Sequence, residues 1–106
     1  MTNKKKSVYT LIVQVGRSKN DGLPAGSTGA GLLCYASGID EPEAVRETVA
    51  ILKQADLAPL GVTGHGTVED RLKGGEEIGE DELNLMERAE NENSVIVAQM
   101  TPFFEN

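Results

Sequence analysis

The residue best suited to acid–base chemistry is His65, the single histidine of the chain, which stands between two glycines in Gly64-His65-Gly66. A histidine titrates near neutral pH, so it can take or give a proton when an acid such as Glu69 or Asp70 stands nearby. His65 is therefore the candidate general acid or base. No nucleophile lies at a defined spacing from it, so an ordinary turn histidine is the competing interpretation.

The same histidine is expected near the carboxyl end of a strand, which is the edge where ligands of open α/β sheets gather. Ser37 and Gly38 follow an earlier apolar segment and are expected at that edge too. We therefore predict that Ser37, Gly38 and His65 line a shallow ligand-binding pocket. Asp40 and the acids after it already place negative charge at the start of the next helix, which disfavours an anionic ligand.

Two other motifs resemble known sites only in part. The segment Gly26-Ser27-Thr28-Gly29-Ala30-Gly31 has neither the lysine of a phosphate-binding loop nor the strand–helix context of a dinucleotide site, so an irregular loop or bulge is expected. Cys34, the single cysteine, lies in an apolar stretch without an adjacent base and is expected to be structural. One cysteine and one histidine cannot hold a structural zinc ion, and the acids from Glu69 to Glu82 lack the order of a calcium loop. We predict no metal and no cofactor.

Charge is distributed unevenly along the chain. Residues 1–37 carry a net charge of +4 and residues 38–106 carry −11, which together give the −7 of the whole chain. The acidic part should repel phosphate backbones, so we expect no direct binding to nucleic acid. Glu80, Asp81 and Glu82 could dock a basic protein surface, and the alternative is an ordinary solvated helix face. In the basic part, Arg17 and Lys19 are candidate contacts to a partner.

Both phenylalanines of the chain, Phe103 and Phe104, fall within its last four residues. Aromatic side chains are costly to leave in water, so they are expected to pack on the chain's own core or on a twin subunit. We therefore expect a homo-oligomer. No apolar stretch approaches the ~20 residues of a membrane-spanning helix, and no secretory signal is recognised. With a single cysteine, which cannot form an internal disulfide, these features predict a cytoplasmic protein without membrane contact.

The elements that must position these residues follow from hydrophobic periodicity. Residues 8–15 alternate as a strand does, and residues 30–36 predict a second strand antiparallel to it. A helix capped by Asp40, with Pro42 and Glu43 in its first turn, ends by Pro59. Residues 60–63 predict a third strand, which would complete a right-handed βαβ unit with the second.

The acidic segment from Glu69 to Glu77 is interpreted as a connection, after which a second helix begins near Glu80 with Gly79 as its cap. Residues 94–100 predict a fourth strand that Pro102 stops. The order β-β-α-β-α-β predicts an α+β two-layer sandwich, a four-stranded sheet with two helices on one face. One domain is expected over residues 1–106, with a flexible basic tail at 1–7 and a mobile loop at 16–28.

Taken together, these features favour a non-catalytic binding, regulatory or assembly module that is cytoplasmic and homodimeric. One alternative is an acidic inhibitor-type protein that docks a basic partner surface. The other is a small enzyme that uses His65 as its general acid or base. No convergent set of catalytic side chains supports the enzyme, which makes the module the preferred hypothesis.

Overall fold

Two central strands with alternating apolar side chains form the middle of the sheet. In the computed structural model, which describes residues 6–105, β1 (Ser7–Gly16) pairs with β2 (Ser27–Gly38) as an antiparallel ladder from Ser7↔Gly38 to Val15↔Ala30. Leu11 and Val13 of β1 and Cys34 of β2 are fully buried. The predicted antiparallel pairing of the first two strands is confirmed.

The other two strands form the edges of the sheet. β3 (Ala58–Thr67) pairs with β1 and β4 (Val95–Phe104) pairs with β2, so the strand order is β3-β1-β2-β4 and all neighbours are antiparallel. β2 and β3 run in the same direction, but β1 lies between them, so the predicted βαβ unit is split by an inserted strand. Pro102 does not stop β4, because an edge strand tolerates a residue without an amide hydrogen.

The first helix begins as predicted. In α1 (Glu41–Gln54), the Asp40 carboxylate accepts a hydrogen bond from the Glu43 backbone N–H at 2.9 Å, and Pro42 stands in the first turn. Buried Ala44, Thr48 and Leu52 form the inner face of this helix at spacings of four residues. This stripe sets which side of α1 packs on the sheet.

Between β3 and the last strand, the chain forms two helices where one was predicted. α3 (Glu80–Glu92) begins after Gly79, as expected. The segment interpreted as a connection contains a short helix, α2 (Val68–Lys73), with Thr67 as its N-cap. Thr67 and Asp70 exchange hydrogen bonds between side chain and backbone in a capping box, a signal that is readable in the sequence as Thr-x-x-Asp.

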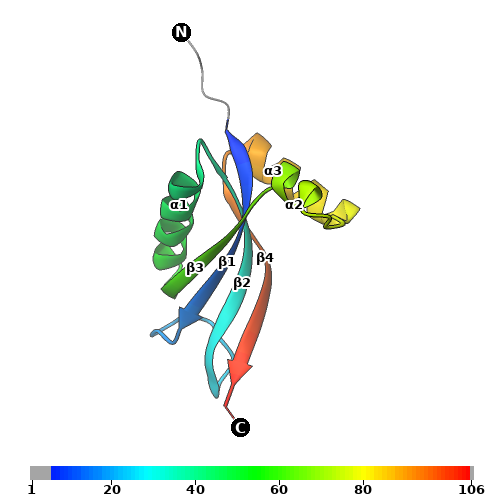
Figure 1. Ribbon diagram of the computed structural model, residues 1–106. Helices are drawn as coiled ribbons and strands as arrows, with labels where there is room; N and C mark the ends of the chain where they lie inside the picture. Colours follow the sequence, from blue (N-terminus) through cyan, green and yellow to red (C-terminus); the bar gives the residue numbers. More distant parts are fainter. Residues whose placement is uncertain (1–5, 106) are drawn as a thin grey trace.

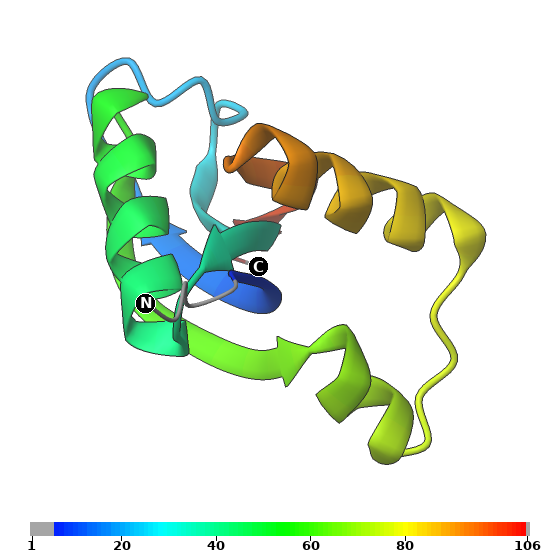
Figure 2. The same cartoon turned by 90° about the horizontal axis from the view of Figure 1, so that it is seen from above.

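The helices lie on opposite faces of the sheet, which corrects the predicted placement of both on one face. Leu11 and Cys34 belong to a core cluster with Ala44 and Leu52 of α1, whereas Val8 and Tyr35 belong to a second cluster with Met86 and Ala89 of α3. Since side chains alternate along a strand, these two sets point to opposite faces. Figures 1 and 2 show α1 and the α2–α3 pair well apart, on either side of the strands. The α+β class, the four strands and their order along the chain are confirmed.

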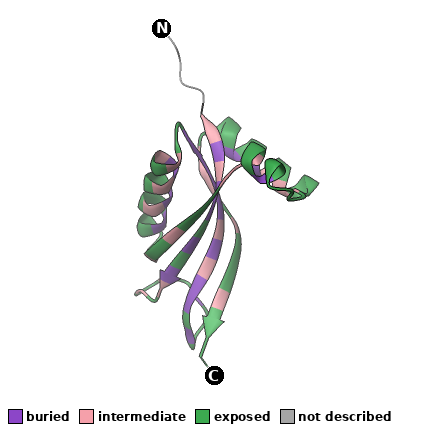
Figure 3. Cartoon of the chain, viewed as in Figure 1, coloured by how far each residue is buried: buried purple, intermediate pink, exposed green. Residues whose placement is uncertain are grey.

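The helices cover only part of the sheet. Figure 1 shows α2 and α3 near one end of the strands, while the opposite end extends beyond them. In Figure 3 the buried positions concentrate on β1 and β2, and the edge strands are largely intermediate or exposed. Lys4 and Lys5 of the predicted basic tail lie outside the described residues. None of the helices in residues 6–105 is long and apolar enough to cross a membrane.

Candidate binding surfaces

His65 lies inside β3, not beyond its end, at a point where the pairing with β1 is irregular. Its side chain is exposed. The carboxylate of Asp70, expected as a partner acid, instead accepts the backbone N–H of Thr67 at 3.0 Å in the cap of α2. Within residues 6–105, no hydrogen bond or ion pair joins His65 to an acid. The arrangement thus lacks the base–acid pair that general acid–base chemistry would use.

Ser37 and Gly38 lie at the end of β2, with β1 between them and β3. Ser37 is buried and lines a small cavity of about 110 Å³ between β2, α1 and the start of β4, which His65 does not line. Its Oγ finds no hydrogen-bond partner among the described residues. Gly38 packs against the start of α1, where an added Cβ would lie 2.9 Å from the backbone nitrogen of Ala44. The three residues predicted to form one pocket therefore do not line one cavity.

Arg17 organises the loop between β1 and β2. Its Nη1 donates to the backbone oxygen of Ser27 at 2.7 Å, and its Nε donates to the carboxylate of Asp21 at 3.0 Å. Backbone hydrogen bonds from Ser18 and Leu23, followed by the Arg17 contact, lower the pKa of Asp21 to about 2. The Arg17 guanidinium is thus used within the loop, while Lys19 stays exposed. Mobility of this loop remains a prediction.

Glu82, predicted as a partner contact, belongs to a polar cluster that ties α2 and α3 to the sheet. We define the polar cluster as Thr10, Tyr35, Arg71 and Glu82. The Tyr35 hydroxyl donates to Glu82 Oε1 at 2.6 Å, and Arg71 Nη1 lies 3.4 Å from the same oxygen. Arg71 also donates to the buried Thr10 Oγ1 at 3.2 Å. Glu80 and Asp81, the other two acids of that turn, are exposed.

Burial and mutual contacts shift the pKa values of this cluster. Burial, with the hydrogen bond to Glu82, raises the pKa of Tyr35 to about 12. The Tyr35 hydrogen bond lowers the pKa of Glu82, with further lowering by Arg71. Burial alone would lower the pKa of Arg71, but its two glutamate partners more than offset this and raise it. The charged forms of Arg71 and Glu82 are therefore the native ones at neutral pH.

The lowered pKa of Glu82 predicts a specific pH dependence of stability. A carboxyl whose folded pKa lies below its unfolded value, ~4.3, contributes stability above that value and loses it as the pH falls through the folded pKa. We expect Glu82→Gln to be less stable than the wild type at pH 7 and this difference to shrink below about pH 4. Urea unfolding of both proteins between pH 7 and pH 3 measures it. A difference that stays constant would contradict this assignment.

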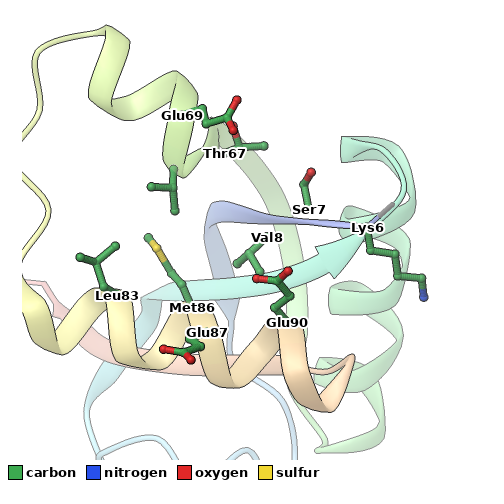
Figure 4. Close-up of a pocket in the computed structure, with 10 residues that line it drawn as sticks. Lys6, Ser7, Val8, Thr67, Glu69, Leu83, Met86, Glu87 and Glu90 are labelled. Carbon is green, nitrogen blue, oxygen red and sulfur yellow. The ribbon is translucent and has the colours of Figure 1, made fainter. Parts of the chain in front are cut away.

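A groove lies between the start of α2 and one side of α3, over the end of β1. It has a volume of about 440 Å³ and is open to solvent. Figure 4 shows the side chain of Met86 of α3 standing between Leu83 and Val8 of β1. Val8 and Met86 are nearly fully buried, whereas Leu83 is 41% exposed. Apolar side chains thus form the floor and one wall of this groove.

Acidic side chains stand around the groove. Glu69 lies on the α2 side, and Glu87 and Glu90 lie on the α3 side (Figure 4). Lys6 also borders the groove, but its Nζ donates to Asn93 at 2.8 Å and lies 3.8 Å from Glu43, so its charge is directed away. Within residues 6–105, none of these three groove glutamates forms an ion pair. The rim is therefore strongly negative.

The uncovered end of the sheet presents a second surface, on the face that α3 covers at the other end. We call it the open half-face. Phe103 lies over Gly31, at 3.2 Å from where a Cβ of that residue would stand, and Leu60 packs in the same way beside Gly16. The open half-face consists of Ile12, Gln14, Gly31, Leu33, Leu60, Thr63, Gln99, Thr101 and Phe103. Of its four large apolar side chains, Leu33 is half-buried and the other three are 37–70% exposed. The remaining members are Gly31 and neutral polar residues.

The opposite face of β4 also exposes apolar side chains. Phe104 follows Phe103 in the strand and so points to that opposite face, where it is 57% exposed and Val97 and Met100 are each 45% exposed. The two phenylalanines therefore do not enter the chain's own core, which was one of the two expectations for them. Sequence reasoning had not found Ile12 and Leu33, because a strand pattern does not show how far a helix will cover the sheet.

One family of proteins matches almost the whole of the described fold. The family described as Domain of unknown function (DUF8846) matches residues 8–104, from the first strand to the last. The chain belongs to this family. No curated protein and no solved structure matches the chain. The matched residues include the polar cluster, the open half-face and all of the groove except Lys6 and Ser7, and the match brings no named activity.

Proposed function

We propose that the protein is a non-catalytic, cytoplasmic assembly module that forms a homodimer through the open half-face. The observation that carries the proposal is the complete lack of charge on this surface. β1, β2, β3 and β4 contain no Lys, Arg, Asp or Glu, although a quarter of the chain is charged. An exposed sheet face that has apolar side chains and no charge is typical of an interface.

A second copy of the chain is the partner that this surface fits best. Two chains that each carry a net charge of −7 repel each other over most of their surfaces. They can approach where neither is charged, and a twofold axis would bring two identical neutral faces together. Sheets pack face to face at about 10 Å, with the side chains of both filling the space between. Ile12, Leu33 and Phe103 would form the centre of such an interface.

Placing one charge on the open half-face tests the proposal. Ile12 is 37% exposed, so Ile12→Glu should fold normally while burying a carboxylate in the dimer, which costs several kcal/mol in an apolar interface. We expect a dimer for the wild type and a monomer for the variant in light scattering. Leu72→Glu on α2, where the native leucine is 54% exposed, is the matched control and should remain dimeric.

Two results would overturn the proposal. The first is a wild-type protein that is monomeric at high concentration. The second is a dimer that Ile12→Glu leaves intact, which would place the interface elsewhere. Circular dichroism of each variant checks that the sheet has formed before the mass is interpreted. A cytoplasmic location is supported by Cys34, which is free and buried, as thiols are in a reducing compartment.

A further inference from the structure

We propose that the groove between α2 and α3 binds a short segment of a partner protein in which aliphatic side chains are flanked by lysine or arginine. This site is separate from the open half-face. It lies over the covered end of the sheet, between the starting turn of α2 and the exposed flank of α3. The proposal therefore does not depend on the dimer.

The floor of the groove requires an apolar group. Val8 and Met86 leave little area accessible, but Leu83 remains 41% exposed, and Val68 is half-buried opposite it. An aliphatic side chain inserted between Leu83 and Val68 would remove both from water, which contributes about 25 cal/mol per Å² of apolar surface buried. The volume of about 440 Å³ lies within the range of about 300–1,000 Å³ that is usual for small binding sites.

The rim determines the charge of the occupant. Glu69 stands on one wall, and Glu87 and Glu90 stand three residues apart on the other, so an inserted segment would lie between carboxylates on both sides. Lysine or arginine next to the apolar anchor would pair with them. Phosphate-bearing ligands and acidic lipid surfaces would be repelled. The combined requirement for a cation and an aliphatic group points to a peptide segment.

The first-turn acids of α3 are a different surface. Glu80 and Asp81 are exposed but do not line the groove, and Glu82 is engaged by Tyr35 and Arg71. From the sequence, these three acids were the candidate contacts to a basic partner, with a solvated helix face as the alternative. The groove instead selects Glu87 and Glu90, because only acids beside an apolar surface can combine charge with burial.

A labelled peptide with leucines flanked by lysines provides the probe, and fluorescence anisotropy measures its binding to the full chain. We expect Glu87→Gln combined with Glu90→Gln to weaken binding roughly tenfold, since each exposed ion pair contributes up to about 1 kcal/mol. The matched control is Glu80→Gln combined with Asp81→Asn, which removes the same charge from the same helix. It should change the affinity less than about twofold.

A second peptide, with serines in place of the leucines, tests the apolar part of the groove. We expect it to bind at least roughly tenfold more weakly, because it buries no aliphatic surface against Leu83 and Val68. Equal binding of both peptides, equal loss in the two double variants, or no binding of the leucine peptide would each overturn the proposal. Ile12→Glu should bind the leucine peptide as the wild type does, which distinguishes failure of this site from failure of the dimer.

Discussion

Replacing Arg71 with alanine is expected to lower the free energy of unfolding by about 2–3 kcal/mol. The side chain is 10% exposed, and its guanidinium contacts Glu82 at 3.4 Å, Glu76 at 3.3 Å and the buried Thr10 hydroxyl. Removing it leaves Glu82 beside Tyr35 without a cation. Because Glu82 is itself 33% exposed, the loss falls below the 3–5 kcal/mol typical of a fully buried pair. Urea unfolding at pH 7 measures the difference.

A lysine on the same helix provides the control for this substitution. Lys73 is exposed, and Lys73→Ala should change the stability by less than about 0.5 kcal/mol. Near-equal stabilities of the two variants would show that the polar cluster does not hold α2 to the sheet. Glu82→Gln, which keeps the shape of the side chain, should fall between them at neutral pH.

Gly29→Ala is expected to destabilise the protein by about 3 kcal/mol or more. In the native backbone, a Cβ at Gly29 would stand 2.3 Å from the carbonyl oxygen of Val15, in the neighbouring strand β1. The obstacle is backbone of the central ladder, so it cannot move aside as a flexible side chain would. The clash would separate β1 from β2 where the open half-face begins. Thermal unfolding followed by circular dichroism detects it.

The same substitution at Gly74 serves as the reference. There a Cβ would lie 3.5 Å from the nearest backbone oxygens, which is an ordinary contact distance. Gly74→Ala should be neutral or stabilise by about 0.4–1 kcal/mol, because it restricts the unfolded chain. If Gly29→Ala unfolded at the same temperature as Gly74→Ala, the close approach of the two strands would be wrong.

The local parts of the fold could be read from the sequence. Asp40 and Pro42 specify the start of α1, and Gly79 with the acids after it specifies the start of α3. These signals act through hydrogen bonds and charges within one turn, so neighbouring residues determine them. The capping box at Thr67 is a signal of the same kind. This capping box did not lead to a predicted helix, because the residues after it are charged and the helix is only six residues long.

The arrangement of the sheet could not be read in the same way. The pairing of the consecutive strands β1 and β2 was predicted, but the other two ladders join strands far apart in sequence, and nothing local in β1 shows that β3 will pair with its other edge. Thr10 in β1 is an example, because a polar residue that alternates with apolar ones in a strand is typical of a solvent-facing position. It is buried at 3% exposure because Arg71, contributed by α2, pairs with its hydroxyl. For this reason the strand pattern did not show that α2 and α3 cover this face of the sheet.

The candidate sites show the same division. Phe103 and Phe104 could be selected as candidate contacts from their residue type and their place near the end of the sequence, since aromatic side chains are costly to leave in water. The groove depends on Val8, Val68 and Met86, which come from three different elements and meet only in the folded chain. The polar cluster likewise joins Tyr35 to Glu82, 47 residues apart. Acids in a charged run look alike in sequence, and only packing distinguishes Glu82 from Glu80.

Sedimentation equilibrium of the wild-type protein at low and high salt tests the homodimer most directly. Because the proposed interface is neutral and each chain carries −7, salt should screen the repulsion and tighten the dimer. We predict a mass of twice the 11.3 kDa chain, with a dissociation constant that falls as salt is added. A monomer at both salt concentrations, or a dimer that salt dissociates, would contradict the assignment of the open half-face.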